Sequence, residues 1–334
     1  MHKCLPDGKL IGEKMKYSIV IPCYKSAATI AKVVELTINE LKAQNINNYE
    51  FVLVNDASPD DGMTIKELKM LSQKYDFVKA VDLAKNAGQH NAILAALSCA
   101  DGDAFIAMDD DMQTHPSQLK YLINEFQKGY DIVYGYYPEK KHSFVRNLAS
   151  KLNYWSVRVL IGKPKDLKTS SFWIIRRYVR DRVIEYNSSY TYLQGLFLRT
   201  TRNISCIPIK HFEREVGTSG YTFKSLLKLW SSILGFSVIP LRIAMVVGIF
   251  LSLLGGIGGI YVIIHKILFS SIAMGNWGIL YAMCFMTGVI LFFMGLIGEY
   301  IGRLSMTVNK EPQYVIREVY TKKCNANVEK YEEL

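Results

Sequence analysis

The chain has 334 residues, half of them apolar, and a formal net charge of +10. This length allows one sizeable domain with an appendage, or two small domains. A positive charge is compatible with nucleic acid, an anionic membrane or anionic substrates, but no helix-turn-helix, zinc-finger or aromatic RNA-binding pattern is present, so we expect no nucleic-acid partner. The six cysteines are scattered without CxxC spacing, which argues against a disulfide or metal framework and suits a reducing compartment.

Strands and helices alternate along the first part of the chain. Residues 1–14 form a polar leader without the apolar core of a secretory signal, and we interpret them as a dispensable extension. Short apolar runs predict strands at 17–22, 51–54, 78–83, 104–108 and 131–134. Helical spacing of apolar residues predicts helices at 29–41, 65–71, 91–99 and from Pro116 onward. This alternation indicates an α/β domain with a mostly parallel sheet covered on both faces.

Polar residues follow three of the predicted strands. Tyr24 follows the first strand, Asp56 follows the second, and the run Asp109-Asp110-Asp111 follows the fourth. In parallel sheets ligands bind outside the carboxyl ends of the strands, so we expect the binding site at this edge.

The three aspartates predict a metal site. Side chains at alternate positions after a strand point the same way, so Asp109 and Asp111 are placed to bind one divalent cation, Mg²⁺ or Mn²⁺, together with substrate phosphates. Without a cation, three adjacent carboxylates repel one another. The alternative is an acidic loop that caps the helix beginning near Pro116.

The second part of the chain predicts contact with a membrane. Residues 139–163 and 221–237 are basic and amphipathic and fit helices lying on a membrane surface, although packed helices with a solvated basic face fit the first segment equally well. Residues 238–264 and 279–301 are each long and apolar enough to cross a bilayer. Residues 302–334 are predicted to be a cytoplasmic tail.

The distribution of charge predicts the orientation of this two-helix hairpin. The short link between the spans contains His265 and Lys266, whereas more basic residues lie outside the pair: Lys224, Lys228, Arg242, Arg303, Lys310 and Arg317. The positive-inside rule therefore places the first domain and both termini on the cytoplasmic side.

Four motifs stand in order along the first domain: VIPCYKSAATI (20–30), VNDASPDD (54–61), KNAGQHNAILAAL (85–97) and MDDDMQTHP (108–116). Together with the two apolar spans they resemble family 2 glycosyltransferases of the GT-A fold. The resemblance is closest to polyisoprenyl-phosphate glycosyltransferases, relatives of dolichyl-phosphate mannose synthase. It covers nearly everything from Tyr17 to about Asn309 and implies a Rossmann-like GT-A domain over residues 15–220.

The resemblance implies a set of residues that contact the nucleotide-sugar: Pro22, Tyr24, Asp56, Asn86, Gly88, Asn91 and Asp109. Among them, Asp56 matches the aspartate that binds uridine or guanosine. Asn86 and Asn91 fit helix caps equally well. The family usually has a glutamate two residues after the tyrosine, where this chain has Ser26, so contacts with the base or ribose are expected to differ.

The resemblance also implies metal, lipid-phosphate and catalytic residues. Asp109 and Asp111 match the metal-binding DxD, and Gln113 matches a glutamine beside the metal. The segment HFEREVGTSGYTF (211–223) resembles the family's last segment before the membrane, where Arg214 and Ser219 suit the lipid phosphate. Arg214 also suits the donor diphosphate, and a surface ion pair with a neighbouring glutamate is its structural alternative.

Asp166 and the TSSFW run stand in the place of a DFR-like family motif, but the arginine is absent. Asp110 and Asp166 are therefore the candidates for assisting a proton transfer, and Arg214 is the third catalytic candidate. The implied reaction is inverting transfer of a hexose from a nucleotide-sugar to a polyisoprenyl phosphate at the cytoplasmic membrane face, with a UDP-linked donor preferred over a GDP-linked one. The product would supply lipid-linked sugar for cell-surface glycans, and a homo-oligomer is expected.

Two other functions remain open from the sequence. A processive polysaccharide synthase shares the fold but usually has a QxxRW motif, and Gln194 lacks the following arginine and tryptophan. A non-catalytic membrane scaffold that keeps the fold is the other alternative, and the intact DxD argues against it.

Overall fold

The computed structural model describes residues 15–138, 164, 166–186, 192–210, 212 and 312–322, with single positions between 264 and 308. Within these residues the strands are β1 (Tyr17–Cys23), β2 (Tyr49–Asn55), β3 (Val78–Leu83), β4 (Ala104–Ala107), β5 (Ile132–Tyr136), β6 (Trp173–Arg176), β7 (Ile204–Pro208) and β8 (Ile316–Tyr320). The helices are α1 (Ile30–Ala43), α2 (Met63–Lys74), α3 (Gln89–Cys99), the short 3₁₀ helix η1 (Pro116–Gln118), α4 (Leu119–Phe126), α6 (Arg177–Ile184) and α7 (Leu193–Thr200). The five strands predicted between residues 17 and 134 are present, and so are the helices predicted at 29–41, 65–71, 91–99 and from Pro116 onward, with small shifts at their ends.

The described strands form one eight-stranded sheet in the order β7-β5-β6-β4-β1-β2-β3-β8. Parallel pairing joins β4 to β1, β1 to β2, β2 to β3 and β5 to β7. Strand β6 is antiparallel to β4 and β5, and β8 is antiparallel to β3. The prediction of a mostly parallel α/β sheet of the GT-A kind is confirmed. Because the four central strands run in one direction, their carboxyl ends lie along one edge.

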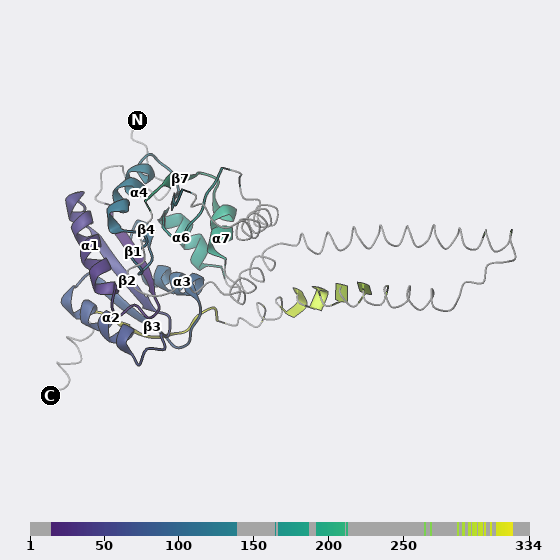
Figure 1. Ribbon diagram of the computed structural model, residues 1–334, viewed down its shortest axis with the longest axis horizontal. Coiled ribbons are helices and arrows are strands. Elements are labelled where there is room, and N and C mark those ends of the chain that lie inside the picture. Colours follow the sequence, from purple (N-terminus) through teal and green to yellow (C-terminus); the bar gives the residue numbers. More distant parts are fainter. Residues whose placement is uncertain are drawn as a thin grey trace.

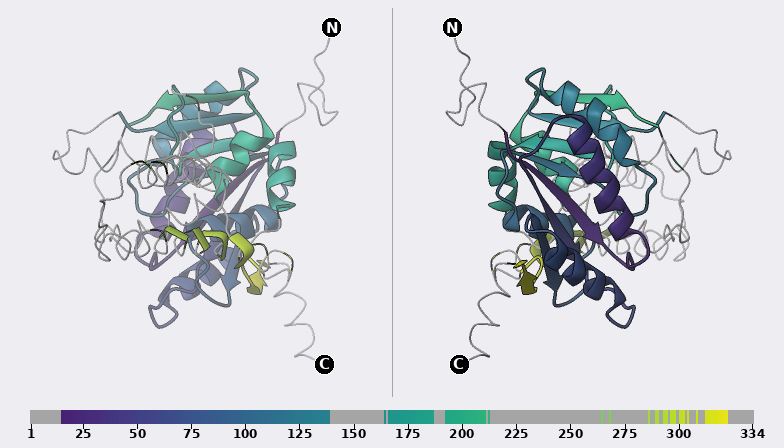
Figure 2. Two further views of the ribbon diagram at one scale, coloured as in Figure 1. Left: turned by 90° about the vertical axis from the view of Figure 1, so that its right-hand side faces the viewer. Right: turned by 90° about the vertical axis from the view of Figure 1, so that its left-hand side faces the viewer.

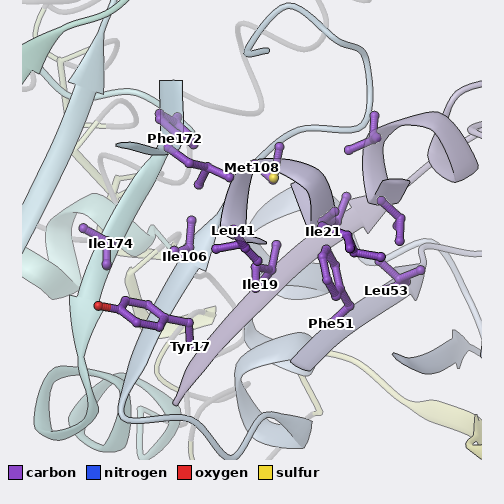
Figure 3. Packing of buried hydrophobic residues seen from close by; sticks show 14 of the residues in the cluster. Tyr17, Ile19, Ile21, Leu41, Phe51, Leu53, Ile106, Met108, Phe172 and Ile174 are labelled. Atoms are coloured by element: carbon purple, nitrogen blue, oxygen red, sulfur yellow. The ribbon is translucent and has the colours of Figure 1, made fainter. Parts of the chain in front are cut away.

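Helices cover both faces of the sheet (Figures 1 and 2). Alternate residues of β1 enter different cores, since Ile19 and Ile21 pack with α1, α2 and α4, whereas Val20 packs with α3, α6 and α7. Figure 3 shows the first of these cores, where Phe51 of β2 lies beside the β1 side chains. A strand buried on both faces is mostly apolar, which explains the run YSIVIPC, where the buried Ser18 is the polar exception.

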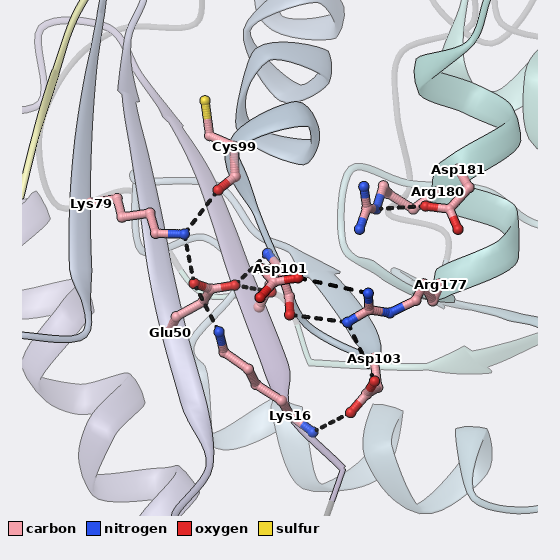
Figure 4. Close-up of polar contacts among 10 residues, drawn as sticks. Lys16, Glu50, Lys79, Cys99, Asp101, Asp103, Arg177, Arg180 and Asp181 are labelled. Atoms are coloured by element: carbon pink, nitrogen blue, oxygen red, sulfur yellow. Dashed lines mark hydrogen bonds and ion pairs between the residues drawn. The ribbon is translucent and has the colours of Figure 1, made fainter. Parts of the chain in front are cut away.

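The amino-terminal edge of the central strands is closed by a buried carboxylate (Figure 4). Glu50 accepts hydrogen bonds from the Ser18 hydroxyl at 2.7 Å and the Asp101 amide at 2.6 Å, and it pairs with Lys16 at 3.2 Å and Lys79 at 3.0 Å. Burial raises the pKa of Glu50, but these hydrogen bonds and the Lys79 charge outweigh it and hold the pKa below its usual value. The charges at this edge are therefore used in mutual pairing that ties the strands together.

Strand β8 was not predicted, because the sequence analysis treated residues 302–334 as a tail. Residues Ile316–Tyr320 instead form the edge strand beside β3. The sheet of the first domain is therefore completed by chain that follows the predicted membrane hairpin.

Most of the predicted membrane-associated residues lie outside the described part of the chain. This applies to the segments 139–163 and 221–237 and to most of the spans 238–264 and 279–301. The residues that are described contain no helix with the length and apolar character needed to cross a bilayer. The single described positions between 264 and 308 are helical, and large apolar side chains among them are exposed, such as Leu268 and Met294.

Candidate active site

The loops that leave β1, β2 and β4 share an unusual backbone conformation. Lys25, Ala57 and Met112 have φ angles of 59°, 46° and 61°. Non-glycine residues seldom adopt this left-handed conformation, and each instance costs on the order of 1–3 kcal/mol. Contacts at this edge must therefore hold the three loops in place, and such strain is typical of binding sites.

Asp109 is held from two sides. The Gln89 side-chain amide donates to Asp109 Oδ1 at 2.8 Å, and the Ser171 hydroxyl donates to Asp109 Oδ2. Gln89 is the first residue of α3, and Ser171 lies two residues before β6. Sequence analysis did not predict either residue, because an isolated polar residue forms no recognisable pattern with its neighbours in the sequence.

Asp111 lies two residues after Asp109 in the loop that follows β4. The Gln113 amide donates to Asp111 Oδ1 at 3.0 Å. Burial raises the pKa of Tyr137 to about 12, and the charges of Asp109 and Asp111 add to this rise, although a hydrogen bond with Thr114 lowers it. Both carboxylates therefore lie close enough to Tyr137 for their charges to act on its hydroxyl. Tyr137 is a further site residue that sequence analysis missed.

Asp110 points toward the loop after β1. Its Oδ2 accepts a hydrogen bond from the Ser26 hydroxyl and a longer one, at 3.4 Å, from the Tyr24 amide. Burial raises the pKa of this carboxyl even though the Ser26 hydrogen bond lowers it. Asp110 thus joins the loops after β1 and β4, and the charge of its neighbour Asp111 adds to the rise of its pKa.

Asp56 organises the loop before α3. Its carboxylate accepts hydrogen bonds from the Ala87 amide at 2.6 Å, the Gly88 amide at 3.0 Å and the Asn86 side chain at 3.1 Å. Asp56 is buried, and Gly88 has a φ of +85°, which favours glycine. Three residues predicted for the nucleotide pocket thus meet in one cluster.

The remaining nucleotide candidates lie around this cluster. The Asn91 side chain donates to the Ala87 carbonyl at 3.1 Å, and its Oδ1 is buried without a hydrogen-bond partner among the described residues. Pro22 is half-buried in β1, paired in register with Val54. Tyr24 lies just beyond β1 and is 49% exposed.

Phe212, two residues before Arg214, lies against the loop that follows β4. The Phe212 amide donates to the Gln113 carbonyl at 3.1 Å, and the rings of Phe212 and His115 are 5.2 Å apart. Arg214 and Ser219 themselves lie outside the described residues. Asp166 is exposed in a turn five residues before Ser171, and the Cys206 thiol contacts its carbonyl oxygen at 3.6 Å.

The residues present fit a hard divalent cation. Asp109 and Asp111 are half-buried oxygen donors that act on the same hydroxyl. Within the described part of the chain, no group of three or more His, Cys, Asp or Glu side chains is arranged to hold a metal. The protein's share of the ligands would therefore be these two carboxylates, with substrate phosphates and water supplying the rest, as is usual for Mg²⁺.

Residues 18–192 match the family model described as glycosyl transferase family 2. This match covers more than half of the chain. The protein belongs to glycosyl transferase family 2. Residues 239–304, which include most of both predicted spans, match the model described as the GtrB C-terminal hairpin.

Relatives of similar length support this membership. The chain is 32% identical over 318 residues to a Proteus mirabilis (strain HI4320) protein named undecaprenyl-phosphate 4-deoxy-4-formamido-L-arabinose transferase, covering 94% of this chain and 97% of the relative. It is 33% identical to the putative glycosyltransferase CsbB of Bacillus subtilis (strain 168), covering 90% and 91%. Among solved structures, it resembles glucosyl-3-phosphoglycerate synthase of Mycobacterium tuberculosis in complex with Mn²⁺, UDP and phosphoglyceric acid. That likeness has a TM-score of 0.48 and 16% identity, over 66% of this chain and 78% of that one.

Proposed function

We propose that this family 2 glycosyltransferase transfers a sugar from a nucleotide-sugar to a polyprenyl phosphate at the cytoplasmic face of a membrane. The observation that carries the proposal is the contact between the Asp56 cluster and the loop after β4, since Gln89, which follows Gly88, donates to Asp109. The same chain also matches the GtrB C-terminal hairpin. The names of relatives along nearly the full length, which specify undecaprenyl phosphate, support the acceptor.

The described residues suggest how the donor is held. The backbone and side chains around Asp56, Asn86 and Gly88 form the proposed nucleoside pocket, with Tyr24 at its rim. Asp109 and Asp111 would hold Mg²⁺ or Mn²⁺, which when bound neutralises the donor diphosphate and stabilises it as a leaving group. Gln113 is proposed beside that cation. Arg214 is proposed to contact the donor diphosphate or the lipid phosphate, since Phe212, two residues earlier, contacts Gln113 in the loop after β4.

The acceptor chemistry needs little help from a base. A phosphate monoester has a second pKa of about 6, so it is largely dianionic near neutral pH. One of its oxygens attacks the anomeric carbon while the bond to the donor diphosphate breaks on the opposite face, which inverts the configuration. Asp110, which contacts Tyr24 and Ser26, and the exposed Asp166 are proposed to assist only with a hydroxyl acceptor. Arg214 and Ser219 are proposed to hold the lipid phosphate.

The donor sugar differs between the prediction from the sequence and the names of the relatives. Sequence analysis predicted a hexose and a UDP-linked donor, whereas several relatives are named for a formamido-arabinose, which is a pentose. A donor panel must therefore include hexoses, amino sugars and pentoses, each linked to UDP or GDP where available.

The test is transfer of labelled sugar to polyprenyl phosphate by the detergent-purified full chain. We expect a lipid-soluble product that is lost with EDTA and reduced by at least about 100-fold in Asp111→Asn, since removal of a metal ligand removes leaving-group stabilisation. Asp76→Asn is the matched control. Asp76 lies two residues before β3, is exposed, and forms a surface ion pair with Lys322 at 2.7 Å. A water-soluble polymer would indicate a polysaccharide synthase instead. Absence of product from every donor in a folded protein would support the scaffold alternative.

A further inference from the structure

Strand β8 and the residue before it contact residues 82–84, which directly precede the loop of the Asp56 cluster. Its pairing with β3 aligns Glu318 with Asp82, and the Ala84 amide donates to the Val315 carbonyl at 2.9 Å. Arg317 adds a second contact, since its guanidinium donates to the Ala84 carbonyl at 3.2 Å. Ala84 lies two residues before Asn86. A segment that follows the GtrB hairpin match, residues 239–304, therefore fixes the start of the loop that Asp56 binds.

Arg317 also reaches the turn after β2 through a chain of hydrogen bonds. Its guanidinium pairs with Asp82 Oδ2 at 3.2 Å, and Asp82 Oδ1 accepts from the Asn55 side-chain amide at 2.8 Å. The carbonyl oxygen of that Asn55 amide then accepts from the Ser58 hydroxyl at 2.7 Å and the Ser58 backbone amide at 3.2 Å. The Ser58 hydroxyl in turn accepts from the Lys25 amide at 3.0 Å. One path of contacts thus joins β8 to the loops after β2 and β1.

The residues in the middle of this path are buried, which restricts how their side chains can be oriented. Asp82 and Asn55 are both buried, at 5% and 4% exposure, whereas the Arg317 side chain is 60% exposed. A buried carboxylate needs a counter-charge or hydrogen bonds. Because Asp82 takes the amide nitrogen of Asn55, the oxygen of that side chain must face Ser58. The orientation of Asn55 then fixes the turn that contains Asp56 and the strained Ala57.

We propose that Arg317 is a positioning residue for donor binding, acting through Asp82 and Asn55 on the turn that carries Asp56. This inference rests on the proposed function for the identity of the donor. The strand after the hairpin is therefore part of the machinery that shapes the nucleotide pocket, in addition to closing the edge of the sheet.

The test compares Arg317→Ala, Arg317→Lys and Ser58→Ala with the unmodified chain, by transferase kinetics and by titration with UDP and GDP. We expect Arg317→Ala to raise the donor KM and the nucleotide Kd about tenfold, equivalent to about 1.4 kcal/mol, with the acceptor KM unchanged. Arg317→Lys should recover part of the affinity, because lysine keeps the charge near Asp82 but lacks the second donor group. Ser58→Ala breaks the path at its other end and should raise the same two constants. If Arg317→Ala does not fold, the lysine and Ser58 variants carry the test.

Lys322→Ala is the matched control, because Lys322 lies two residues after β8 and pairs with the exposed Asp76 rather than with Asp82. It should leave both KM values unchanged. A change in thermal stability alone, or parallel changes in the donor and acceptor KM, would show that Arg317 only closes the sheet and would overturn the inference. Unchanged nucleotide affinity in the Arg317 and Ser58 variants would overturn it too, even where transfer is intact. Failure of the unmodified chain to transfer sugar, with nucleotide affinity still dependent on Arg317, would instead refute only the acceptor reaction.

Discussion

His90 is expected to make the stability of the sheet domain depend on pH. It lies in the first turn of α3, with its ring 5.7 Å from that of Tyr192. Burial lowers the pKa of His90 from 6.5 to about 4 and raises the pKa of Tyr192 to about 12. Tyr192 therefore stays neutral and offers no charge to stabilise an imidazolium. The amino-terminal end of a helix is also unfavourable for a cation.

The sign of the effect follows from which state binds the proton. Between pH 6.5 and about 4 the unfolded chain protonates this imidazole and the folded protein does not. Stability is therefore full above pH 6.5 and is lost as the pH falls through this window. At about 1.4 kcal/mol for each pH unit the ceiling is about 3 kcal/mol. Because the ring is only half-buried, solvent screening should reduce this to about half.

Thermal unfolding of the detergent-purified chain tests this expectation. For a domain of this size a loss of 1 kcal/mol lowers Tm by about 2–4 °C, so His90 should account for a fall of about 3–6 °C between about pH 7.5 and about pH 4.5. Other groups titrate in the same range, so the measured quantity is the difference between the unmodified chain and His90→Gln. The variant should show a smaller fall in Tm. Equal falls in the two proteins would refute the expectation that this imidazole stays neutral in the folded protein below pH 6.5.

Two further substitutions test the packing and the site. Gly102→Ala should lower stability by about 1–3 kcal/mol, because its Cβ would lie 2.9 Å from the Ser18 backbone nitrogen, which cannot move aside cheaply; an unchanged Tm would contradict this close approach. Ser171→Ala should raise the Mn²⁺ concentration for half-maximal activity about tenfold, because partners that orient a metal ligand typically contribute this much. Ser98→Ala, which removes a hydroxyl bonded to the Ala95 carbonyl on the far part of α3, is the control for the second substitution. Equal metal dependence in the two serine variants would exclude a role for Ser171 in holding Asp109.

The central part of the fold was predictable because its signal is local. The run from Tyr17 to Cys23 is apolar at every position that enters a core, and the helices on either side repeat their apolar residues at helical spacing. The strands that were missed depend on distant partners. β6 has four residues, β7 and β8 have five each, and β8 pairs with a strand more than 200 residues earlier in the chain. Such short segments acquire strand structure from their neighbours in the sheet rather than from their own pattern.

The aspartates of the candidate site could be predicted from the sequence, whereas the residues that contact them could not. Strand periodicity predicted that Asp109 and Asp111 point the same way, and in the structure the charges of both act on the Tyr137 hydroxyl. The partners Gln89 and Ser171 come from elements that are remote in sequence, so no motif around the aspartates contains them.

Ser26 shows how a departure from a family pattern can be read physically. This chain has serine where the resemblance leads us to expect glutamate, and the structure places its buried hydroxyl against the carboxylate of Asp110. A second carboxylate at this position would face a group whose pKa burial already raises, so like charges would meet in a poorly solvated space. A hydroxyl instead donates a hydrogen bond and joins the loop after β1 to the loop after β4. The loop predicted to contact the nucleotide and the loop predicted to hold the metal are therefore linked through residues 26 and 110, and any account of donor affinity must treat these two positions as one unit.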